Sequence, residues 1–315
     1  MKIKYFLMAA VVALMTACGT ASKVPLTGRT HRISISDAQL LSLSNQEYTK
    51  FMASAKRSTD AKNTAMVQRV GRNLANAVET YLRNNGYANE INNFKWEFNL
   101  VQDKQANAFC MPGGKIVVYE GLFPYTQNEA SLAIVLGHEI AHAVAKHSAE
   151  QITKQMNQQM GTNILGTVLN STVGSGLGDI ASQVAGGYFS FRNLKSLFAD
   201  DTYLNCFRNL KYSRDNESEA DYMGLIFAAM AGYDPANAVT FWQRMAAATN
   251  SSRSEILSDH PSDARRIENI KKWLPEAEKY YRGRGSNRVS STGYPQSSKT
   301  LHIGGSSSSK RSNRR

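Results

Sequence analysis

The 315-residue sequence predicts a mainly helical α+β domain that contains one small antiparallel sheet. Three observations support this fold class. Apolar residues recur with helical spacing in several long segments between residues 36 and 280. Residues alternate in polarity from Phe94 to Val101, as in a half-buried strand. Strands are also expected over residues 108–119, where Pro112-Gly113-Gly114 is typical of a hairpin turn.

Helices are expected both before and after these strands in the sequence. The first two span Ser36–Ala55 and Asp60–Arg83, and the second carries an apolar stripe that would face the core. A third, from Gln127 to Lys146, would begin with a capping box formed by Thr126 and Glu129. Later helices are expected from the acidic segment 213–221 into the apolar stretch 222–230, over residues 236–247, and over residues 262–280.

The third helix contains His138-Glu139-x-x-His142. Residues four apart share a helix face with Cβ atoms about 5–6 Å apart, so both imidazoles can bind one tetrahedral ion. Glu139 projects beside the pair, where it can act as a general base without being a ligand. The surrounding residues are mostly apolar, and a buried His pair with a carboxylate needs partners because desolvation is costly. The pattern therefore favours a zinc hydrolase over a core His pair.

Catalytic zinc usually has three protein ligands and a water, so another ligand must lie elsewhere. The metzincin pattern would place Gly and His at the positions of Ala145 and Ser148, and that class is therefore excluded. His147 lies about 140° round a continuous helix from His142, which predicts a surface residue that faces away.

Glu217 is the better candidate for the third ligand. Glu217 and Asp221 are four apart, so Glu217 can bind the ion while Asp221 accepts the outer N–H of a ligating His. Acidic residues also gather in first helical turns to complement the dipole, which alone would explain Glu219. The sequence thus predicts one zinc ion per chain, held by His138, His142 and Glu217.

These motifs resemble the family of zinc metalloendopeptidases that includes HtpX, BepA and the CAAX prenyl endopeptidases. Besides His138-Glu139-x-x-His142 and Glu217-x-x-Ala220-Asp221, segment 107–119 and the His260-Pro261 pair with Arg266 are similar to motifs of that family. The resemblance implies a gluzincin-like zincin fold whose edge strand lines the active-site cleft and binds extended, unfolded polypeptides through main-chain hydrogen bonds. The strand residues expected to bind substrate are Asn107, Ala108, Phe109 and Cys110.

The resemblance also implies catalytic roles. Glu139 would deprotonate a water activated by the metal, and His260 or Arg266 would stabilise the oxyanion that forms. In BepA-like members the equivalent His can instead occupy the open zinc position. His260 is therefore an inhibitory ligand, a transition-state stabiliser or an ordinary loop residue.

The N-terminus has the features of a secretory signal peptide, with Lys2 and Lys4 before an apolar run. Thr16-Ala17-Cys18 resembles the end of a bacterial lipobox, which predicts a lipid anchor on Cys18; ordinary cleavage that leaves Cys18 free is the alternative. No later apolar run reaches the roughly 18 residues of a spanning helix. These features favour the soluble, exported, BepA-like branch and an outer-membrane lipoprotein that faces the periplasm.

The net charge of +12 is concentrated at the ends of the chain. Segment 282–315 carries eight basic residues and no acidic one, and its Ser and Gly content is typical of a disordered tail. Because the tail has a single aromatic residue, Tyr294, nucleic-acid binding is not expected. The expected organisation is a signal peptide (1–17), a lipid-anchored linker (18–35), a zinc metallopeptidase domain (36–281) and the basic tail (282–315).

Two functions fit the sequence. The first is a zinc endopeptidase that uses a metal-activated water to cleave misfolded or misassembled cell-envelope proteins. The second is a zinc-stabilised chaperone or binding module whose protease site is latent.

Overall fold

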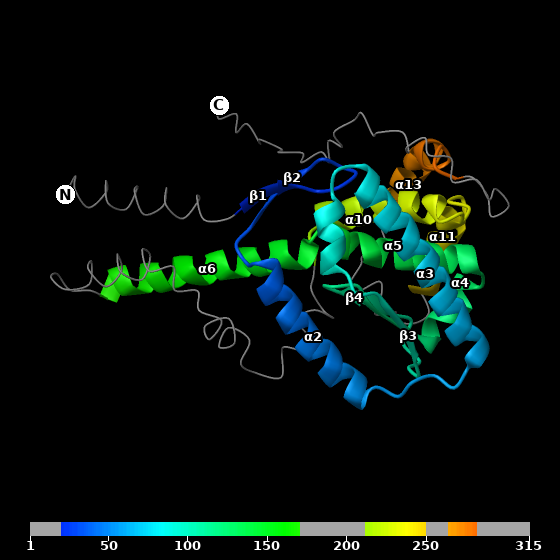
Figure 1. Ribbon diagram of the computed structural model, residues 1–315, viewed down its shortest axis with the longest axis horizontal. Coiled ribbons are helices and arrows are strands. Elements are labelled where there is room, and N and C mark those ends of the chain that lie inside the picture. Colours follow the sequence, from blue (N-terminus) through cyan, green and yellow to red (C-terminus); the bar gives the residue numbers. More distant parts are fainter. Residues whose placement is uncertain (1–19, 171–211, 250–263, 282–315) are drawn as a thin grey trace, which may run out of the picture.

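The computed structural model describes residues 20–170, 212–249 and 264–281, which form a helical domain around a small sheet (Figure 1). Helix α2 spans Asp37–Ser54 and α3 spans Ala61–Asn84. Ser36 caps α2 through a complete capping box, and the Asp60 side chain accepts a hydrogen bond from the Asn63 amide at the start of α3. The two helices predicted before the sheet are therefore confirmed.

The main sheet contains β3 (Glu97–Val101), β4 (Ala108–Met111) and β5 (Lys115–Tyr119) in the order β3-β5-β4. β4 and β5 are antiparallel, but β3 is parallel to β5, so the prediction of a wholly antiparallel sheet was wrong. The short turn after β4 forces the antiparallel pair. β5 is buried along its whole length and takes the central position, which leaves β3 to pair along its other side.

The two faces of the sheet are covered by different helices. Leu100, Cys110 and Ile116 pack in the main core with α3 and α5, whereas Phe109 and Val117 pack against α2. In Figure 1 the sheet lies between α2 and α3.

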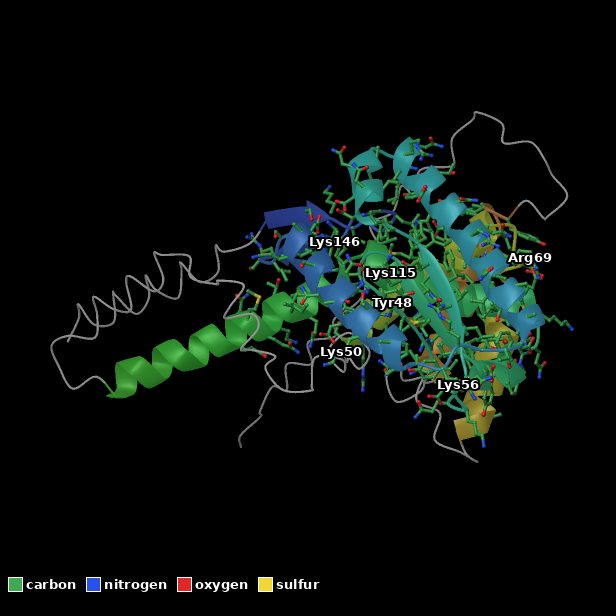
Figure 2. The ribbon with its side chains drawn as sticks, turned by 60° about the horizontal axis from the view of Figure 1, so that its bottom comes forward. Tyr48, Lys50, Lys56, Arg69, Lys115 and Lys146 are labelled. Atoms are coloured by element: carbon green, nitrogen blue, oxygen red, sulfur yellow. The ribbon has the colours of Figure 1, made fainter. Side chains whose placement is uncertain are left out.

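A polar cluster accompanies the α2 side of the sheet. Figure 2 shows Tyr48 and Lys115 beside each other, with the Lys115 ammonium 5.8 Å from the Tyr48 ring centroid. Tyr48 donates a hydrogen bond to Glu97, and Lys115 pairs with the same carboxylate. The cluster therefore links α2 to β3 and β5.

Helix α5 spans Glu129–Val144 and begins at Asn128, whose side chain accepts a hydrogen bond from the Ser131 amide. The predicted capping box at Thr126 was wrong, because Thr126 is buried at the end of the short helix α4 (Phe123–Thr126). Gln127 has φ of 63°, so the chain turns between the two helices. The 3₁₀ turns η1 (Ala88–Asn93) and η2 (Glu120–Leu122) complete this half of the domain.

The remaining helices complete the core around α5. They are α6 (His147–Asn170), α10 (Arg214–Met230), α11 (Asn237–Thr249) and α13 (Ala264–Ala277). α10 packs most extensively against α5, while α6 extends away from the body of the domain (Figure 1). In the parts of the chain that the structure describes, no helix combines the length and apolar character needed to cross a bilayer.

A hairpin of β1 (Thr20–Lys23) and β2 (Thr30–Ile33) precedes α2. Segment 18–35 is expected from its sequence to be a linker, but from Thr20 onward it folds onto the domain. Val24, in the turn region, is completely buried in the main core, and Leu26 is also buried. The apolar residues of this segment therefore explain why it is ordered.

Candidate metal centre

The side chains of His138, His142 and Glu217 meet in the interior of the domain, between α5 and α10. One ligand atom from each lies within 4.8 Å of the others, and all three residues are buried. The two Nε2 atoms are 3.0 Å apart, and each is 3.5 Å from an oxygen of Glu217. The predicted set of ligands is thus brought together.

Two glycines allow α5 and α10 to approach closely at this point. A Cβ atom on Gly137 would lie 2.6 Å from the Gly224 carbonyl oxygen, and one on Gly224 would lie 2.5 Å from the His138 amide nitrogen. Neither position can hold a larger side chain without a backbone shift. The close crossing brings the first turns of α10 beside the middle of α5, so Glu217 reaches the His pair.

Asp221 contacts the Nδ1 atom of His138, the ring nitrogen that does not face the other ligands, as predicted. His138 Nδ1 donates to Asp221 Oδ1 at 2.9 Å, and Arg266 Nη2 donates to the same oxygen at 2.6 Å. The Arg266 guanidinium also lies 3.6 Å from the Trp242 ring centroid, an arrangement that sequence spacing does not reveal. Arg266 Nη2 also lies 3.3 Å from His138 Nδ1 and 3.6 Å from Glu217 Oε2, so Arg266 contacts the site directly as well as through Asp221, and its predicted oxyanion role stays a prediction.

The charges around His138 change its protonation. Burial by itself lowers the pKa of His138, but hydrogen bonds with Asp221 and Glu217 outweigh this and raise the pKa to about 9. The site thus strongly attracts positive charge. A zinc ion fits it, because two imidazole nitrogens and one carboxylate face a common point while Nδ1 of each ring has another partner.

Glu139 is 3% exposed and lies on α5, the helix that packs against β4. Burial and then the negative charge of Glu139 raise the pKa of the Cys110 thiol, which is a free thiol in β4. β4 is the end strand of the sheet in the described structure and packs against α5. The predicted general base and the predicted substrate strand are therefore neighbours.

The prediction that His147 lies on the surface was wrong. His147 is completely buried, and its Nδ1 is 2.9 Å from His142 Nδ1. A separation of 140° holds only within one continuous helix, but α5 ends at Val144 and Lys146 has φ of 56°. This left-handed residue redirects the chain, so the first residue of α6 points back to the site.

Glu219 also differs from its prediction. It was explained by the helix dipole alone, but it is completely buried and accepts hydrogen bonds from Thr27, Arg29 and the His147 ring. Burial by itself raises the pKa of Glu219, but the hydrogen bonds of His147 and Thr27 outweigh this and lower the pKa. Glu219 is therefore an ionised, paired carboxylate.

Sequence reasoning also missed Tyr212, whose ring stacks on His142 with centroids 4.1 Å apart. Its hydroxyl is 2.9 Å from Ser148 Oγ. Tyr212 stands before α10, outside any helical pattern, so periodicity gave no signal for it. The predicted residues Cys18 and His260 lie outside the described residues, as does Cys206.

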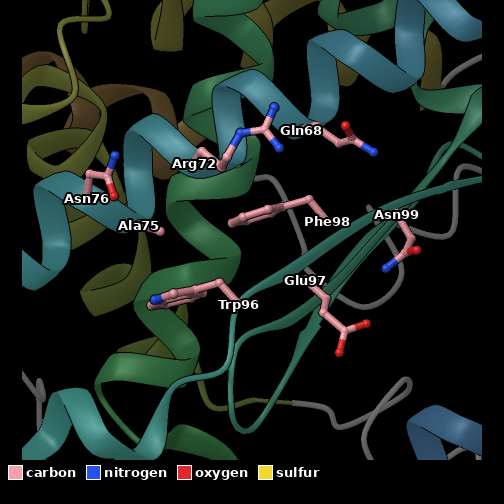
Figure 3. Close-up of a pocket in the computed structure, with 8 residues that line it drawn as sticks. All are labelled: Gln68, Arg72, Ala75, Asn76, Trp96, Glu97, Phe98 and Asn99. Carbon is pink, nitrogen blue, oxygen red and sulfur yellow. The ribbon is translucent and has the colours of Figure 1, made fainter.

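A separate pocket of about 350 Å³ lies between α3 and β3. Figure 3 shows the rings of Trp96 and Phe98 beneath α3, with Glu97 and Asn99 pointing to the other side of β3. None of its lining residues comes from α5 or α10. The pocket therefore lies apart from the metal centre.

The fold and the centre together define a zincin-type metallopeptidase, with a His pair and a base on one helix and a carboxylate ligand on another. The chain matches Peptidase family M48 over residues 61–274 and belongs to that family. The predicted zinc metalloendopeptidase family is thus confirmed.

Curated relatives carry two different names. The chain is 36% identical over 190 residues to mitochondrial metalloendopeptidase OMA1 of Schizosaccharomyces pombe, a match that covers 60% of this chain and 49% of that protein. It is 29% identical over 268 residues to OMA1 of Saccharomyces cerevisiae, covering 82% and 70%. It is 25% identical over 278 residues to the beta-barrel assembly-enhancing protease of Escherichia coli, covering 84% and 51%.

The chain thus spans about half the length of the S. pombe and E. coli relatives. These relatives support the family. The two OMA1 proteins are more similar in sequence to this chain than the E. coli protein is, so the BepA-like branch stays a prediction.

Proposed function

We propose that this protein is an exported zinc endopeptidase that hydrolyses peptide bonds of misfolded or misassembled cell-envelope proteins. The observation that carries the proposal is the convergence of His138, His142 and Glu217 next to the buried carboxylate of Glu139. Membership of family M48 supports the reaction class.

The residues of the site divide the chemistry among them. His138, His142 and Glu217 would hold zinc, which supplies a Lewis acid that polarises a bound water and a peptide carbonyl. Glu139 takes the proton of the attacking water and can return it to the nitrogen of the leaving amine. Asp221 keeps the proton of His138 on Nδ1, so that Nε2 faces the ligand set.

The position of β4 supports an extended polypeptide as substrate. β4 is an end strand of the described sheet and packs against α5, and the negative charge of Glu139 acts on the Cys110 thiol in that strand. A strand added at such an edge is bound through main-chain hydrogen bonds, which select unfolded segments with little regard to sequence.

The Glu139→Gln variant tests the proposal. We expect it to lose casein cleavage while it retains one zinc per chain, because Gln cannot accept the proton but keeps the shape of the site. Glu129→Gln, a change in the first turn of the same helix, is the matched control and should keep both properties. Equal cleavage of casein by the Glu139→Gln variant and the parent would contradict the proposal, and a retained effect on substrate folding would favour the binding module.

We also propose that Cys18 carries a lipid anchor and that the protein faces the periplasm from the outer membrane. The signal-like N-terminus supports this proposal. Labelling of cells with palmitate, followed by membrane fractionation, tests it. Cys18→Ser should abolish the label and release the protein into the soluble fraction, whereas an unlabelled parent protein would refute the anchor.

A further inference from the structure

A chain of hydrogen-bonding side chains runs outward from His142. His142 Nδ1 is 2.9 Å from His147 Nδ1, and His147 Nε2 is 2.9 Å from Glu219 Oε2. Glu219 accepts from Thr27 Oγ1 at 2.5 Å and from Arg29 Nε at 2.7 Å. This series of side chains, which we call the relay, therefore connects His142, a ligand of the metal centre, with the turn of the β1–β2 hairpin.

The chemistry of these groups fixes the direction of each hydrogen bond. An ionised Glu219 can only accept, so His147 carries a proton on Nε2. When Nε2 of His142 binds the metal, its Nδ1 carries the ring proton and donates it to Nδ1 of His147, the atom that the contact with Glu219 leaves as an acceptor. In this arrangement Nε2 of His142 has a free electron pair for the metal and faces Glu217.

The backbone is also shaped to bring His147 to this position. Lys146 has φ of 56°, a left-handed conformation that is unfavourable for a residue other than glycine. Its ammonium is held by Asp37 and Glu90, at 2.9 Å from an oxygen of each. The strained residue is therefore stabilised by its surroundings, and its effect is to turn His147 towards His142.

We propose that His147 and Glu219 are positioning residues that hold His142 in its metal-binding tautomer, and that Thr27 and Arg29 of the hairpin fix the outer end of this relay. The proposal rests on the zinc site described above and adds a contribution of the N-terminal hairpin to zinc affinity. Outer partners of this kind commonly change metal affinity about 10–100-fold.

Zinc affinity, measured by competition with a chromophoric chelator on the full chain, tests the relay. We expect His147→Phe to weaken zinc binding about 10–100-fold, because Phe has a similar shape but cannot accept the His142 proton. His147→Gln, whose amide can both accept and donate, should restore part of the affinity. Glu219→Gln should weaken binding, and Thr27→Val should do so by a smaller factor.

Glu150→Gln is the matched control for these variants. Glu150 pairs with the same Arg29 at 2.7 Å, but the His147 ring has Glu219 as its carboxylate partner. Glu150→Gln should therefore leave zinc affinity within about twofold of the parent, well below the relay effect.

A second measurement separates positioning from stability alone. The Tm of each variant is measured with excess chelator and with saturating zinc, and the absorption bands of the cobalt-substituted protein are recorded. A positioning role reduces the zinc-dependent rise in Tm and shifts the cobalt bands. If the variants lose Tm equally with and without zinc, and their zinc affinity and cobalt bands match those of the parent, the relay is refuted.

The milder variants keep the test decisive if His147→Phe does not fold. Unchanged zinc affinity in both Glu219→Gln and Thr27→Val would then refute the relay. Casein cleavage is scored separately. A parent that binds zinc tightly but does not cleave casein refutes the endopeptidase and leaves the relay supported, whereas a parent that does not bind zinc refutes both.

Discussion

The two histidines of the metal centre are supported in different ways. His138 is held by Asp221, which lies one helical turn beyond the carboxylate ligand on the same helix. His142 contacts His147, which follows a break between two helices, and His147 in turn contacts Glu219. The support of His138 thus follows from regular spacing within helices. The support of His142 depends on an irregular backbone between two helices and on a distant hairpin.

This difference explains what sequence analysis finds and what it misses. Spacing of four residues places side chains on one face only while a helix continues. It located both ligating histidines, Glu217 and Asp221. It failed for His147, because the left-handed Lys146 changes the direction of the chain.

The largest expected effect is a loss of bound zinc on substitution of Glu217, the ligand that lies beside both histidines. Glu217→Gln should prevent retention of zinc through dialysis, since it removes the negative ligand between the two imidazoles. Zinc content by atomic absorption is the measurement. Asp215→Asn, an exposed change in the first turn of the same helix, is the control. Equal zinc loss in both variants would indicate a general effect of helix charge instead of ligation.

The next largest effect on zinc binding is expected for Asp221, the hydrogen-bond partner of His138. Asp221→Asn should lower zinc affinity about 10–100-fold, because the amide is a weaker acceptor for His138 and no longer neutralises Arg266. Chelator competition measures it, with exposed Asp234→Asn as control. A drop like that of Glu219→Gln would show that the two supports are equivalent in strength. No change would leave Asp221 without a role at the centre.

The positions of both histidines relative to Glu217 depend on the close crossing of α5 and α10. Gly224→Ala should reduce the free energy of unfolding by about 1–3 kcal/mol, because the added Cβ meets the backbone of His138. Urea denaturation in excess chelator measures this without a contribution from metal. Ala143→Ser, a small half-buried change on α5, should have a much smaller effect. A Gly224→Ala variant as stable as the parent would show that the helices can move apart freely.

The smallest expected effect is a loss of stability in acid, where Glu150 contacts Arg29 and His31 of the hairpin segment. Burial by itself raises the pKa of Glu150, but hydrogen bonds from His31 and Arg29 outweigh this and lower the pKa to about 2. Because the folded-state pKa lies below the ordinary value of 4.5, this stabilisation is complete above pH 4.5 and disappears as the pH falls through about 2.

Urea midpoints in chelator at several pH values test this expectation. The parent should exceed Glu150→Gln in stability at pH 6, and the difference should shrink between pH 4.5 and 2. A constant difference over that range would show that Glu150 contributes by packing and not by charge.

The fold was predictable to a similar extent as the site. Capping residues Ser36 and Asp60 and the apolar stripe of α3 are local signals, and these helices were found. The parallel pairing of β3 with β5 and the burial of Val24 depend on long-range packing, which the sequence does not display locally. Trp242 and Tyr212 reach the site from segments without a motif, so only the folded structure brings them to notice.

The hydrogen bond between Thr27 and Glu219 joins residues 192 positions apart in the chain. During synthesis the hairpin emerges early, yet its partner on α10 is made only after most of the domain has left the ribosome. Glu217, two residues before that partner, is equally late. A nascent chain therefore cannot assemble the complete metal centre until α10 has been made, because one of its three ligands and the partner of the hairpin both lie on that helix.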